Sequence, residues 1–546
     1  MTSYVITSAP PNPNGDLHLG HLSGPFLGAD VLARHLRQRG NDVHYVGYSD
    51  EHSAYVPRRA AEIGSTAYPT AKLFGDRMEE TLSMGAMHHD WFTRPLTDST
   101  HTEFVQRFFL ELWESGALEV QELPVFRCEP CERYLYESEV RGACHFCAEP
   151  SDGIYCEACG LPQTSGSLAD PKCTACWNTP ETTTLRRIVF PLERWRERLE
   201  AYYADAQSKA EWRPRLISYL EGLFERELPA TPISREADYG IPVPLKGWEG
   251  HILDTWFSGI WGFAAGTARL AEANGDKSEW ERLWTDPQTR IVNFIGFDCS
   301  FSHAVLWPAL LLAQGELTLP SQVVINEFYR LEGEKFSTSR GHAIWGGEFL
   351  RRVNADALRF HLCLTGPERE QNNFSMKEFA DTVSTVLAGG IERWTDTVLD
   401  LLGQDFDSVV PAAAPAGELV AERAALPGEI AAALGAEAFS PQRAAAALAT
   451  TVDRANADLR ELGLLRASGE AEAYAGRLAA HLELLAAVAV AAAPLMPGWS
   501  AFIAGHLGLP VDLVTRMPHW ADGEGRLLAE GARLPSSTPL FFHELS

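Results

Sequence analysis

Residues 4–21, YVITSAPPNPNGDLHLGH, decide the fold of this chain. The apolar run at residues 4–9 predicts a β-strand, the proline, asparagine and glycine residues after it predict a tight turn, and residues 22–38 have the pattern of a helix. This layout presents backbone N–H groups and the imidazoles of His18 and His21 to a phosphate chain. The stretch therefore predicts a nucleotide-binding edge of an α/β sheet.

A second motif, KFSTSR at residues 335–340, follows a strand-like segment at residues 323–325. Its lysine and hydroxyl groups suit the polyphosphate of a nucleotide. A loop of this kind is by itself often only a solvated turn, and an HxGH string also occurs by chance. Together, however, the two motifs predict a clamp that holds a nucleoside triphosphate from two sides.

The composition is that of a soluble chain with several domains. The 546 residues are 45% hydrophobic and 22% charged, which predicts three or four domains. We find no apolar span of about 18 residues and no basic, then apolar N-terminus, so we expect a cytoplasmic protein without a membrane partner. The net charge is −27, and after residue 380 ten arginines and no lysine face 21 acidic residues. This last part repels phosphates unless its arginines cluster.

Strand and helix patterns divide the chain into five parts. Residues 1–117 form a first catalytic half with HLGH, 118–230 an insertion with the cysteines, and 231–325 a second catalytic half. Residues 326–375 form a linker with the KFSTS loop, and the alanine-rich residues 376–546 predict a helical bundle, which opens with the capping pattern SMKE at 375–378. The expected fold class is α/β, with a doubly wound parallel (Rossmann-like) sheet that the insertion splits.

Eight of the ten cysteines form four C-x-x-C pairs. Two such pairs can close one tetrahedral Zn²⁺ site. Disulfides are the alternative, but a chain without a secretion signal lies in a reducing compartment, which favours two structural zinc ions. The pairs are Cys128 and Cys131, Cys144 and Cys147, Cys156 and Cys159, and Cys173 and Cys176. The remaining Cys299 and Cys363 have apolar neighbours and are expected to be packed thiols, with Cys299 near the substrate pocket.

The order of these motifs resembles a known family. HLGH and KFSTS, with the cysteines between them, resemble the HIGH and KMSKS signatures of class I aminoacyl-tRNA synthetases, and over residues 3–400 the chain resembles methionyl-tRNA synthetases. Other matching stretches are DEH at 50–52, ISRE at 233–236, GIPVP at 240–244, and His303 ahead of LWP at 306–308. The resemblance implies an anticodon-binding-like bundle and nested zinc knuckles, with Cys144, Cys147, Cys156 and Cys159 on one metal and Cys128, Cys131, Cys173 and Cys176 on the other.

The resemblance also implies roles for site residues. Adenylation requires in-line attack of a carboxylate on the α-phosphate, whose added charge must meet donors already in place. The implied catalytic residues are His18, His21, Lys335 and Arg235. The implied ATP site, which also takes Mg²⁺, consists of His18, Gly20, His21, Lys335, Ser337, Thr338 and Ser339. The implied amino-acid site consists of Pro10, Asn12, Asp50, Trp256, Phe263, Cys299 and His303, with Asp50 on the ammonium group. Two alternatives stay open, namely Asp50 as a solvated acid and Arg235, just ahead of Glu236, in a structural ion pair.

Several positions depart from the family pattern. At residues 10–12 the chain has PPN where the family has an aromatic wall, and Asn12 suits an amide or charged side chain better than a thioether. Thr338 replaces the second lysine of KMSKS, for which Arg340 is a candidate substitute. At the family's anticodon-reading positions we align Arg393 and Thr397, and Trp394 is a candidate for base stacking.

These observations lead to three functional hypotheses. The first is an amino-acid-activating enzyme that passes the acyl group to a small amine or N-hydroxylamine, as in N–N bond formation. It resembles the synthetase-like domain of hydrazine-forming enzymes, with a separate cupin-type partner because no cupin-like segment is present. In this hypothesis tRNA is a doubtful partner. The second is an ordinary, divergent methionine–tRNA ligase, and the third is a non-catalytic binding relative.

Overall fold

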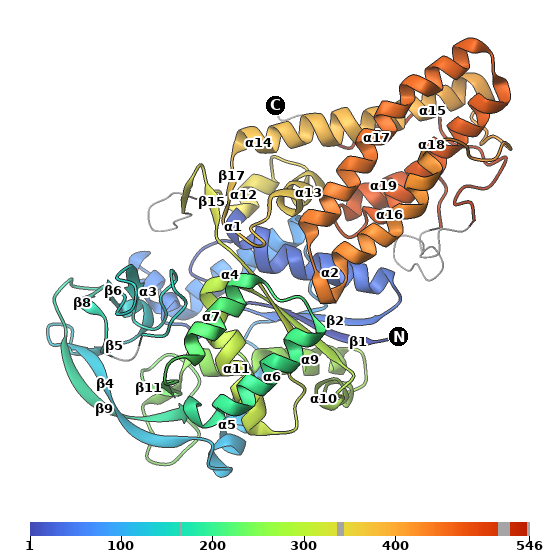
Figure 1. The fold of residues 1–546 in the computed structure, drawn as a ribbon. Helices are drawn as coiled ribbons and strands as arrows, with labels where there is room; N and C mark the ends of the chain where they lie inside the picture. The colour runs from blue at the N-terminus through green and yellow to red at the C-terminus, as the bar shows by residue number, and fades with distance from the viewer. Residues whose placement is uncertain (164–165, 336–342, 511–524, 543–546) are drawn as a thin grey trace.

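The computed structural model describes residues 1–163, 166–335, 343–510 and 525–542 (Figure 1). Its centre is a five-stranded parallel sheet with the strand order β14-β13-β1-β2-β3. The strands are β1 (Ser3–Ser8), β2 (Asp42–Tyr48), β3 (Trp91–Thr93), β13 (Arg290–Gly296) and β14 (Pro320–Asn326). The strands expected at residues 4–9 and 323–325 are therefore present. The order reverses beside β1, which makes the carboxyl ends of β1 and β13 the expected place for a ligand.

Helices cover both faces of this sheet, as expected for a doubly wound fold (Figure 1). Because successive side chains of a strand point to opposite faces, Ile6 packs on the side of α2 (Leu27–Gln38), and Val5 on the side of α5 (Ser99–Glu114), α9 (Gly262–Ala273) and α11 (Trp307–Gln314). The other helices of the two catalytic halves are α1 (Leu19–His21), α3 (Tyr55–Glu62), α4 (Ala67–Met84), α8 (Thr255–Ser258) and α10 (Glu279–Thr285). A short antiparallel pair, β11 (Ser234–Glu236) and β12 (His251–Leu253), lies at the start of the second catalytic half.

The helix expected at residues 22–38 differs in its first turn. A π-helical turn spans Leu22–Phe26, and only from Leu27 does the regular helix α2 begin. Gly24 has non-helical backbone angles and the next residue is Pro25, which has no N–H to donate within the helix. A Cβ at Gly24 would come within 2.4 Å of the side chain of Asn326 at the end of β14. Close packing against the sheet therefore explains the glycine and the kink.

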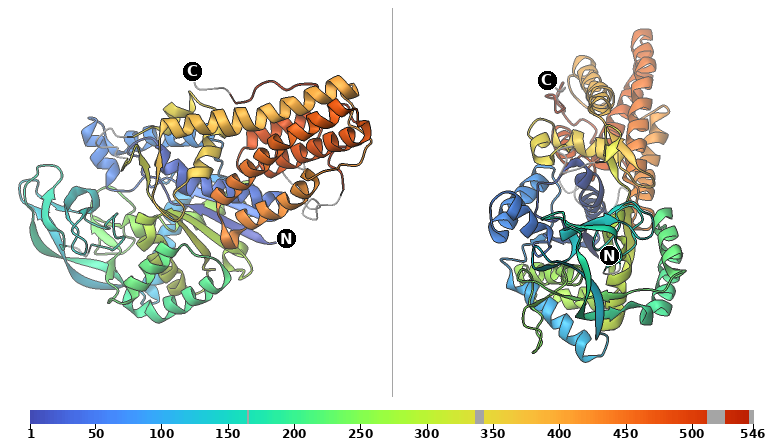
Figure 2. Two further views of the ribbon diagram at one scale, coloured as in Figure 1. Left: turned by 45° about the horizontal axis from the view of Figure 1, so that its top comes forward. Right: turned by 90° about the vertical axis from the view of Figure 1, so that its left-hand side faces the viewer.

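The insertion consists of two antiparallel sheets and two helices. A long ribbon of β4 (Glu119–Cys128) and β9 (Glu181–Pro191) carries β5 (Arg133–Leu135) and β10 (Ala230–Pro232), in the order β10-β9-β4-β5. A small sheet of β6 (Val140–Ala143), β7 (Pro150–Asp152) and β8 (Ala169–Cys173) lies among the cysteines, and α6 (Arg196–Lys209) and α7 (Pro214–Phe224) lead back to the catalytic sheet. Figure 2 shows the insertion and the C-terminal bundle at opposite ends of the molecule.

The linker and the bundle follow β14. The linker contains β15 (Tyr329–Leu331), β16 (Glu334–Lys335), α12 (Gly346–Leu350), α13 (Ala355–Thr365) and β17 (Asn372–Phe374). The bundle contains α14 (Met376–Asp381), which continues through a π-helical segment (Thr382–Glu392) into α15 (Arg393–Phe406), then α16 (Leu419–Leu434), α17 (Pro441–Ser468), α18 (Ala471–Ala491) and α19 (Pro497–His506). The expected cap is present, because Ser375 accepts a hydrogen bond from the N–H of Glu378 at 3.1 Å.

Helix α18 corrects one expectation, because we expected no apolar span of membrane length. In the described part of the chain, α18 alone is long and apolar enough to cross a membrane by length and composition. Of its most apolar window, 83% is buried inside the protein. The span is therefore the central helix of the bundle core.

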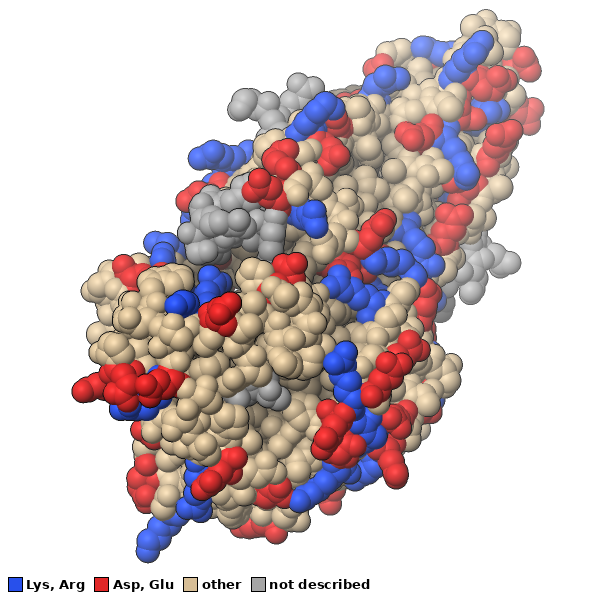
Figure 3. All heavy atoms as spheres, turned by 60° about the vertical axis from the view of Figure 1, so that its left-hand side comes forward, with Lys and Arg blue, Asp and Glu red and all other residues tan. Residues whose placement is uncertain are grey.

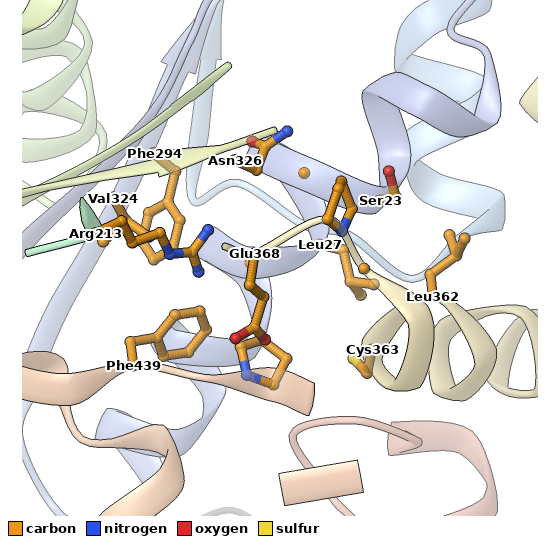
Figure 4. A pocket seen from close by; sticks show the side chains of 15 residues that line it. Ser23, Leu27, Arg213, Phe294, Val324, Asn326, Leu362, Cys363, Glu368 and Phe439 are labelled. Carbon is orange, nitrogen blue, oxygen red and sulfur yellow. The ribbon is translucent and has the colours of Figure 1, made fainter. Parts of the chain in front are cut away.

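The bundle is joined to the sheet by buried polar contacts. Arg359 of α13 is fully buried, and its guanidinium lies 2.7 Å from Asp30 of α2 and also donates to backbone carbonyls. Glu368 accepts hydrogen bonds from the Ser440 hydroxyl and the Gln442 N–H, both at 2.7 Å, at the start of α17. Glu368 also lines a cavity between sheet and bundle (Figure 4), whose 30 Å³ hold about two water molecules at most. This cavity is therefore too small for a nucleotide.

Candidate active site

The HLGH motif lies in the loop between β1 and α2, at the carboxyl end of β1. The rings of His18 and His21 stack with their centroids 3.7 Å apart. The His18 N–H donates to Nδ1 of His21 at 3.2 Å, and the His21 N–H donates to Nδ1 of His18 at 3.3 Å. Gly20 between them is half-buried. The loop therefore holds the two imidazoles stacked on each other.

The described segment that follows the second motif lies beside HLGH. The segment directly after the KFSTS loop pairs with HLGH, because the Leu19 N–H donates to the carbonyl of Ile344 at 3.1 Å and the ring of Trp345 lies 6.4 Å from that of His18. On the other side of the loop, the backbone of Lys335 pairs with Arg330 in β16 and β15. Ser337, Thr338, Ser339 and Arg340 lie outside the described residues, so their expected contacts with ATP stay predictions.

Asp50 and Arg235 lie in a buried charged cluster. The Asp50 N–H donates to the carbonyl of Pro11 at 2.9 Å, which joins the end of β2 to the loop that carries HLGH. Asp50 is 8% exposed, which removes the alternative of a solvated acid. Arg235 forms a buried ion pair with Glu137 of the insertion at 3.0 Å, so the structural pair left open for Arg235 is present, with Glu137 as its partner. Arg235 also donates to the Thr255 hydroxyl at 3.3 Å.

The cluster carries one more carboxylate than its two guanidinium groups match. Besides the pair of Arg235 and Glu137, Arg187 lies 3.7 Å from Asp254. Within the described part of the chain, no hydrogen bond or ion pair engages the carboxylate of Asp50. Burial, and next the charge of Glu137, raise the pKa of Asp50 well above its usual value, although Arg235 opposes this. A cation beside Asp50 would therefore complete the cluster.

Close ring contacts join Tyr48, at the end of β2, to a neutral imidazole. Tyr48, two residues before Asp50, packs its ring 5.3 Å from that of Phe263, and Phe263 lies 5.9 Å from His303. Burial lowers the pKa of His303 to about 4, so its imidazole is neutral at physiological pH. Its Nδ1 lies 2.9 Å from the Ser302 hydroxyl, and its Nε2 is buried without a hydrogen-bond partner. This arrangement offers a mostly apolar wall with one polar atom.

The other residues expected at the amino-acid site differ in their surroundings. Trp256 lies in the first turn of α8, where Asp254 accepts a hydrogen bond from its N–H at 3.2 Å. Asn12 is half-buried, and its side-chain oxygen is buried without a partner, while Pro10 is half-buried in the same loop. Cys299 is half-buried, and burial, followed by the charge of Asp298, raises its pKa well above the usual value. Cys299 is therefore a protonated thiol rather than a nucleophile.

Three residues of this region were missed by the sequence analysis. Glu137 has a positive φ of 44° and reaches the site from the insertion, far away in sequence. Tyr48 has only the pattern of a buried strand residue. Tyr155 packs on Trp256, and its sole signal in the sequence is its place directly before Cys156. No local pattern marks any of them as a site residue.

The cysteines form two groups of four, and the grouping is the nested one that the resemblance implied. Within each group, all four sulfur atoms lie within 4.8 Å of one another. Contacts of 3.4 Å between Cys128 and Cys176 and 3.8 Å between Cys144 and Cys159 are near the roughly 3.8 Å between sulfurs on one tetrahedral zinc. Asn178 donates to the sulfur of Cys176, and its backbone and side-chain amides lower the pKa of that thiol to about 6. Both groups therefore suit a thiolate-bound metal. Cys363 is a packed thiol, as expected.

Comparisons with known proteins agree with this geometry. Residues 4–395 match the family described as tRNA synthetases class I (M). Similar proteins include the methionine–tRNA ligases of Chlorobium limicola, 33% identical over 420 residues that make up 75% of this chain and 59% of the relative, and of Thermomicrobium roseum, 33% identical over 73% of this chain and 68% of the relative. The chain thus spans about three fifths of the length of the first of these relatives.

The fold has a counterpart among solved structures. The methionyl-tRNA synthetase of Mycobacterium tuberculosis in complex with methionyl-adenylate superposes with a TM-score of 0.81 at 21% identity, over 99% of this chain and all of that one. This likeness includes the C-terminal bundle, which the family match up to residue 395 does not reach. On the family match and the identity to its relatives, the chain belongs to the methionyl-tRNA synthetase family of class I synthetases.

Proposed function

We propose that this protein is a ligase that activates an amino acid with ATP and transfers the aminoacyl group to tRNA, as a methionine–tRNA ligase does. The carboxylate of the amino acid attacks the α-phosphate, aminoacyl-AMP forms and pyrophosphate leaves. A ribose hydroxyl of the tRNA then attacks the acyl carbon, and AMP leaves. Methionine is the first candidate substrate, because the relatives compared above are named methionine–tRNA ligases.

The observation that carries this proposal is the buried, unmatched carboxylate of Asp50 beside the HLGH loop. An amino-acid ammonium group at Asp50 would restore the charge balance that burial makes costly to leave open. The substrate carboxylate would then point toward the loop of His18 and His21, where ATP is expected. His18, His21 and Lys335, with Gly20 allowing close approach, are the groups that we assign to the polyphosphate together with Mg²⁺, and Arg235 is assigned to hold Asp50 and Glu137 in place.

The zinc assignment is part of the same proposal. The two groups of four cysteines would each hold one structural Zn²⁺, because four thiolates leave no open position for catalysis. The metals would hold the small sheet of the insertion in place, and Glu137 lies in the turn directly before β6, the first strand of that sheet. Metal analysis of freshly purified protein is expected to return about two zinc ions per chain. A content below one would contradict this assignment.

The decisive experiment is ATP–pyrophosphate exchange with each of the twenty amino acids, with and without tRNA. Asp50→Asn should abolish exchange while ATP binding persists, because the variant lacks only the carboxylate that pairs with the ammonium group. In the wild type, the KM for the amino acid should rise as the pH falls through the raised pKa of Asp50, since the protonated acid cannot pair with an ammonium ion. Asp298→Asn, which leaves Asp50 unchanged, is the matched control. No exchange with any amino acid would refute the proposal.

A second candidate, transfer to a small amine, has no support in the comparisons but does have one observation in its favour. Among the described arginines of the bundle, Arg423, Arg454, Arg466, Arg477 and Arg526 form ion pairs with bundle carboxylates. Acidic and basic side chains are also interspersed on the face shown in Figure 3. Arginines that already pair with carboxylates contribute little to the counterion release that drives binding to phosphates.

The residues aligned with the anticodon-reading positions also limit tRNA contacts. Trp394 is fully buried and donates to Nδ1 of His481 at 3.0 Å, so our expectation that it stacks on bases was wrong. Arg393 is exposed, and Thr397 donates to its own helix. A gel-shift and a charging assay at about 0.1 M salt separate the two candidates. Submicromolar tRNA binding with multiple-turnover charging establishes the tRNA ligase. Pyrophosphate exchange without charging of tRNA favours transfer to a small acceptor.

A further inference from the structure

An aromatic contact joins one cysteine cluster to the expected amino-acid site. Tyr155 directly precedes Cys156, is 8% exposed, and places its ring 4.9 Å from that of Trp256 at an interplanar angle of 73°. The same ring lies 5.4 Å from that of Phe301. Edge-to-face pairs of this kind are attractive beyond the area that they bury. Tyr155 thus packs on Trp256 from the side of the insertion.

The loop that carries Tyr155 is attached to helix α7, which leads from the insertion back to the catalytic sheet. Arg215 of α7 donates to the carbonyl of Ala158 at 3.1 Å, and the Tyr219 hydroxyl donates to the carbonyl of Gly160 at 3.1 Å. Within the knuckle, the Cys156 N–H, next to Tyr155 in the sequence, donates to the carbonyl of Leu161. The knuckle of Cys144, Cys147, Cys156 and Cys159 is therefore the frame that fixes the place of the Tyr155 ring.

A large cavity lies behind this aromatic contact. It has a volume of about 270 Å³ between the insertion and the catalytic halves, and Tyr155, Trp256 and Phe301 line it together with Val125 and Phe126 of β4. Its charged lining residues include Arg187 and Asp254, which lie 3.7 Å apart. Without the ring of Tyr155, Trp256 would have free space behind it into which it can turn.

We infer that Tyr155 is a positioning residue that holds Trp256 as the wall of the amino-acid pocket, so that the cysteine knuckle sets which side chains the enzyme accepts. The inference rests on the proposed function, because it takes amino-acid activation as given. Loss of the Tyr155 ring is expected to weaken binding of the preferred amino acid and to admit larger side chains, which then extend toward the cavity. ATP binding at HLGH should stay unchanged, because Tyr155 has no described contact with that motif.

The first test compares three variants in pyrophosphate exchange. Tyr155→Ala should raise the KM for the preferred amino acid about tenfold or more, lower the discrimination against phenylalanine by a similar factor, and leave the KM for ATP within about twofold. Tyr155→Phe should behave as the wild type, because the ring makes the contact. Phe146→Ala, a 40% exposed aromatic on the same knuckle, is the matched control and should change nothing. An unchanged amino-acid KM in Tyr155→Ala, or an equal rise for ATP, overturns the inference.

A second measurement does not depend on activity. In protein labelled with fluorotryptophan, Trp256→Phe identifies the ¹⁹F resonance of Trp256. Tyr155→Ala, and Tyr155→Leu if the alanine variant does not fold, should shift that resonance, whereas Phe146→Ala should not. Metal removal with a chelator should move it in the wild type and not in the Tyr155 variant. A resonance that stays in place overturns the inference, whereas a wild type inactive with every amino acid refutes the proposed function instead.

Discussion

Charged side chains are arranged differently around the catalytic site and in the helical bundle. At the site, Arg235 and Glu137 are each 3% exposed and come from the second catalytic half and the insertion. In the bundle, Arg466 and Asp405 are 40% and 25% exposed and pair between neighbouring helices. Buried charges tolerate few arrangements, because each needs its partner, whereas exposed charges are solvated in any arrangement. The charges of the site thus depend on the whole fold, whereas an exposed pair such as Arg466 and Asp405 does not.

The stability cost of breaking an ion pair should show this difference most strongly. Glu137→Ala leaves a buried guanidinium without its partner and should lower the free energy of unfolding by about 3–5 kcal/mol. The exposed pair is expected to lose about 0–1 kcal/mol in Asp405→Ala. Urea unfolding of both variants gives the comparison. Equal losses of unfolding free energy in the two variants would mean that burial does not make the ion pair more important for stability.

Activity should distinguish the two regions almost as strongly. His21→Ala removes a group expected at the polyphosphate and should lower adenylate formation by about 10²–10³, comparable to the loss of one transition-state donor. Arg466→Ala in the bundle is the control and should leave pyrophosphate exchange unchanged. If exchange in the His21 variant equals that of the wild type, HLGH does not act on ATP.

A smaller effect is expected at the polar edge of the amino-acid pocket. Asn12 carries a buried oxygen without a partner, so methionine should be a poorer substrate than amino acids with a polar side chain that can donate to it. Asn12→Tyr should raise kcat/KM for methionine relative to asparagine and glutamine by about tenfold, within the range that one side-chain contact gives. Asn14→Tyr, in the same loop, is the control. A wild type that prefers methionine over every polar amino acid would contradict this prediction.

The smallest effect is expected from the cations of the bundle that remain free. Within its described part, Arg393 and Arg460 are exposed, and their side chains make no ion pair or hydrogen bond. Replacing both with alanine should reduce the slope of log K against log salt for tRNA binding by about two, because each arginine would neutralise one phosphate. A nitrocellulose filter assay between about 50 and 200 mM salt measures the slope. No change would place the tRNA contacts elsewhere on the protein.

Much of the fold follows from local patterns. The strands at residues 4–9 and 323–325 are predictable because buried parallel strands are continuous apolar runs. The cap at Ser375 follows from its SMKE sequence, and the four cysteine pairs from their spacing. The nested grouping of the cysteines came from resemblance and agrees with the sulfur distances. The kink at Gly24 was missed, because its cause is the side chain of Asn326, some 300 residues away in the sequence.

The sequence by itself determined the family, the parallel sheet, the two motifs and the cysteines, because each is a local pattern of residue types at fixed spacing. Only the tertiary structure decided that Arg235 pairs with Glu137, that α18 and Trp394 are buried in the bundle core, and that Tyr155 packs on Trp256. These facts depend on which distant segments meet when the apolar surfaces are buried. A contact between segments far apart in the chain leaves no periodicity or spacing in either of them, so no single stretch of sequence could reveal it.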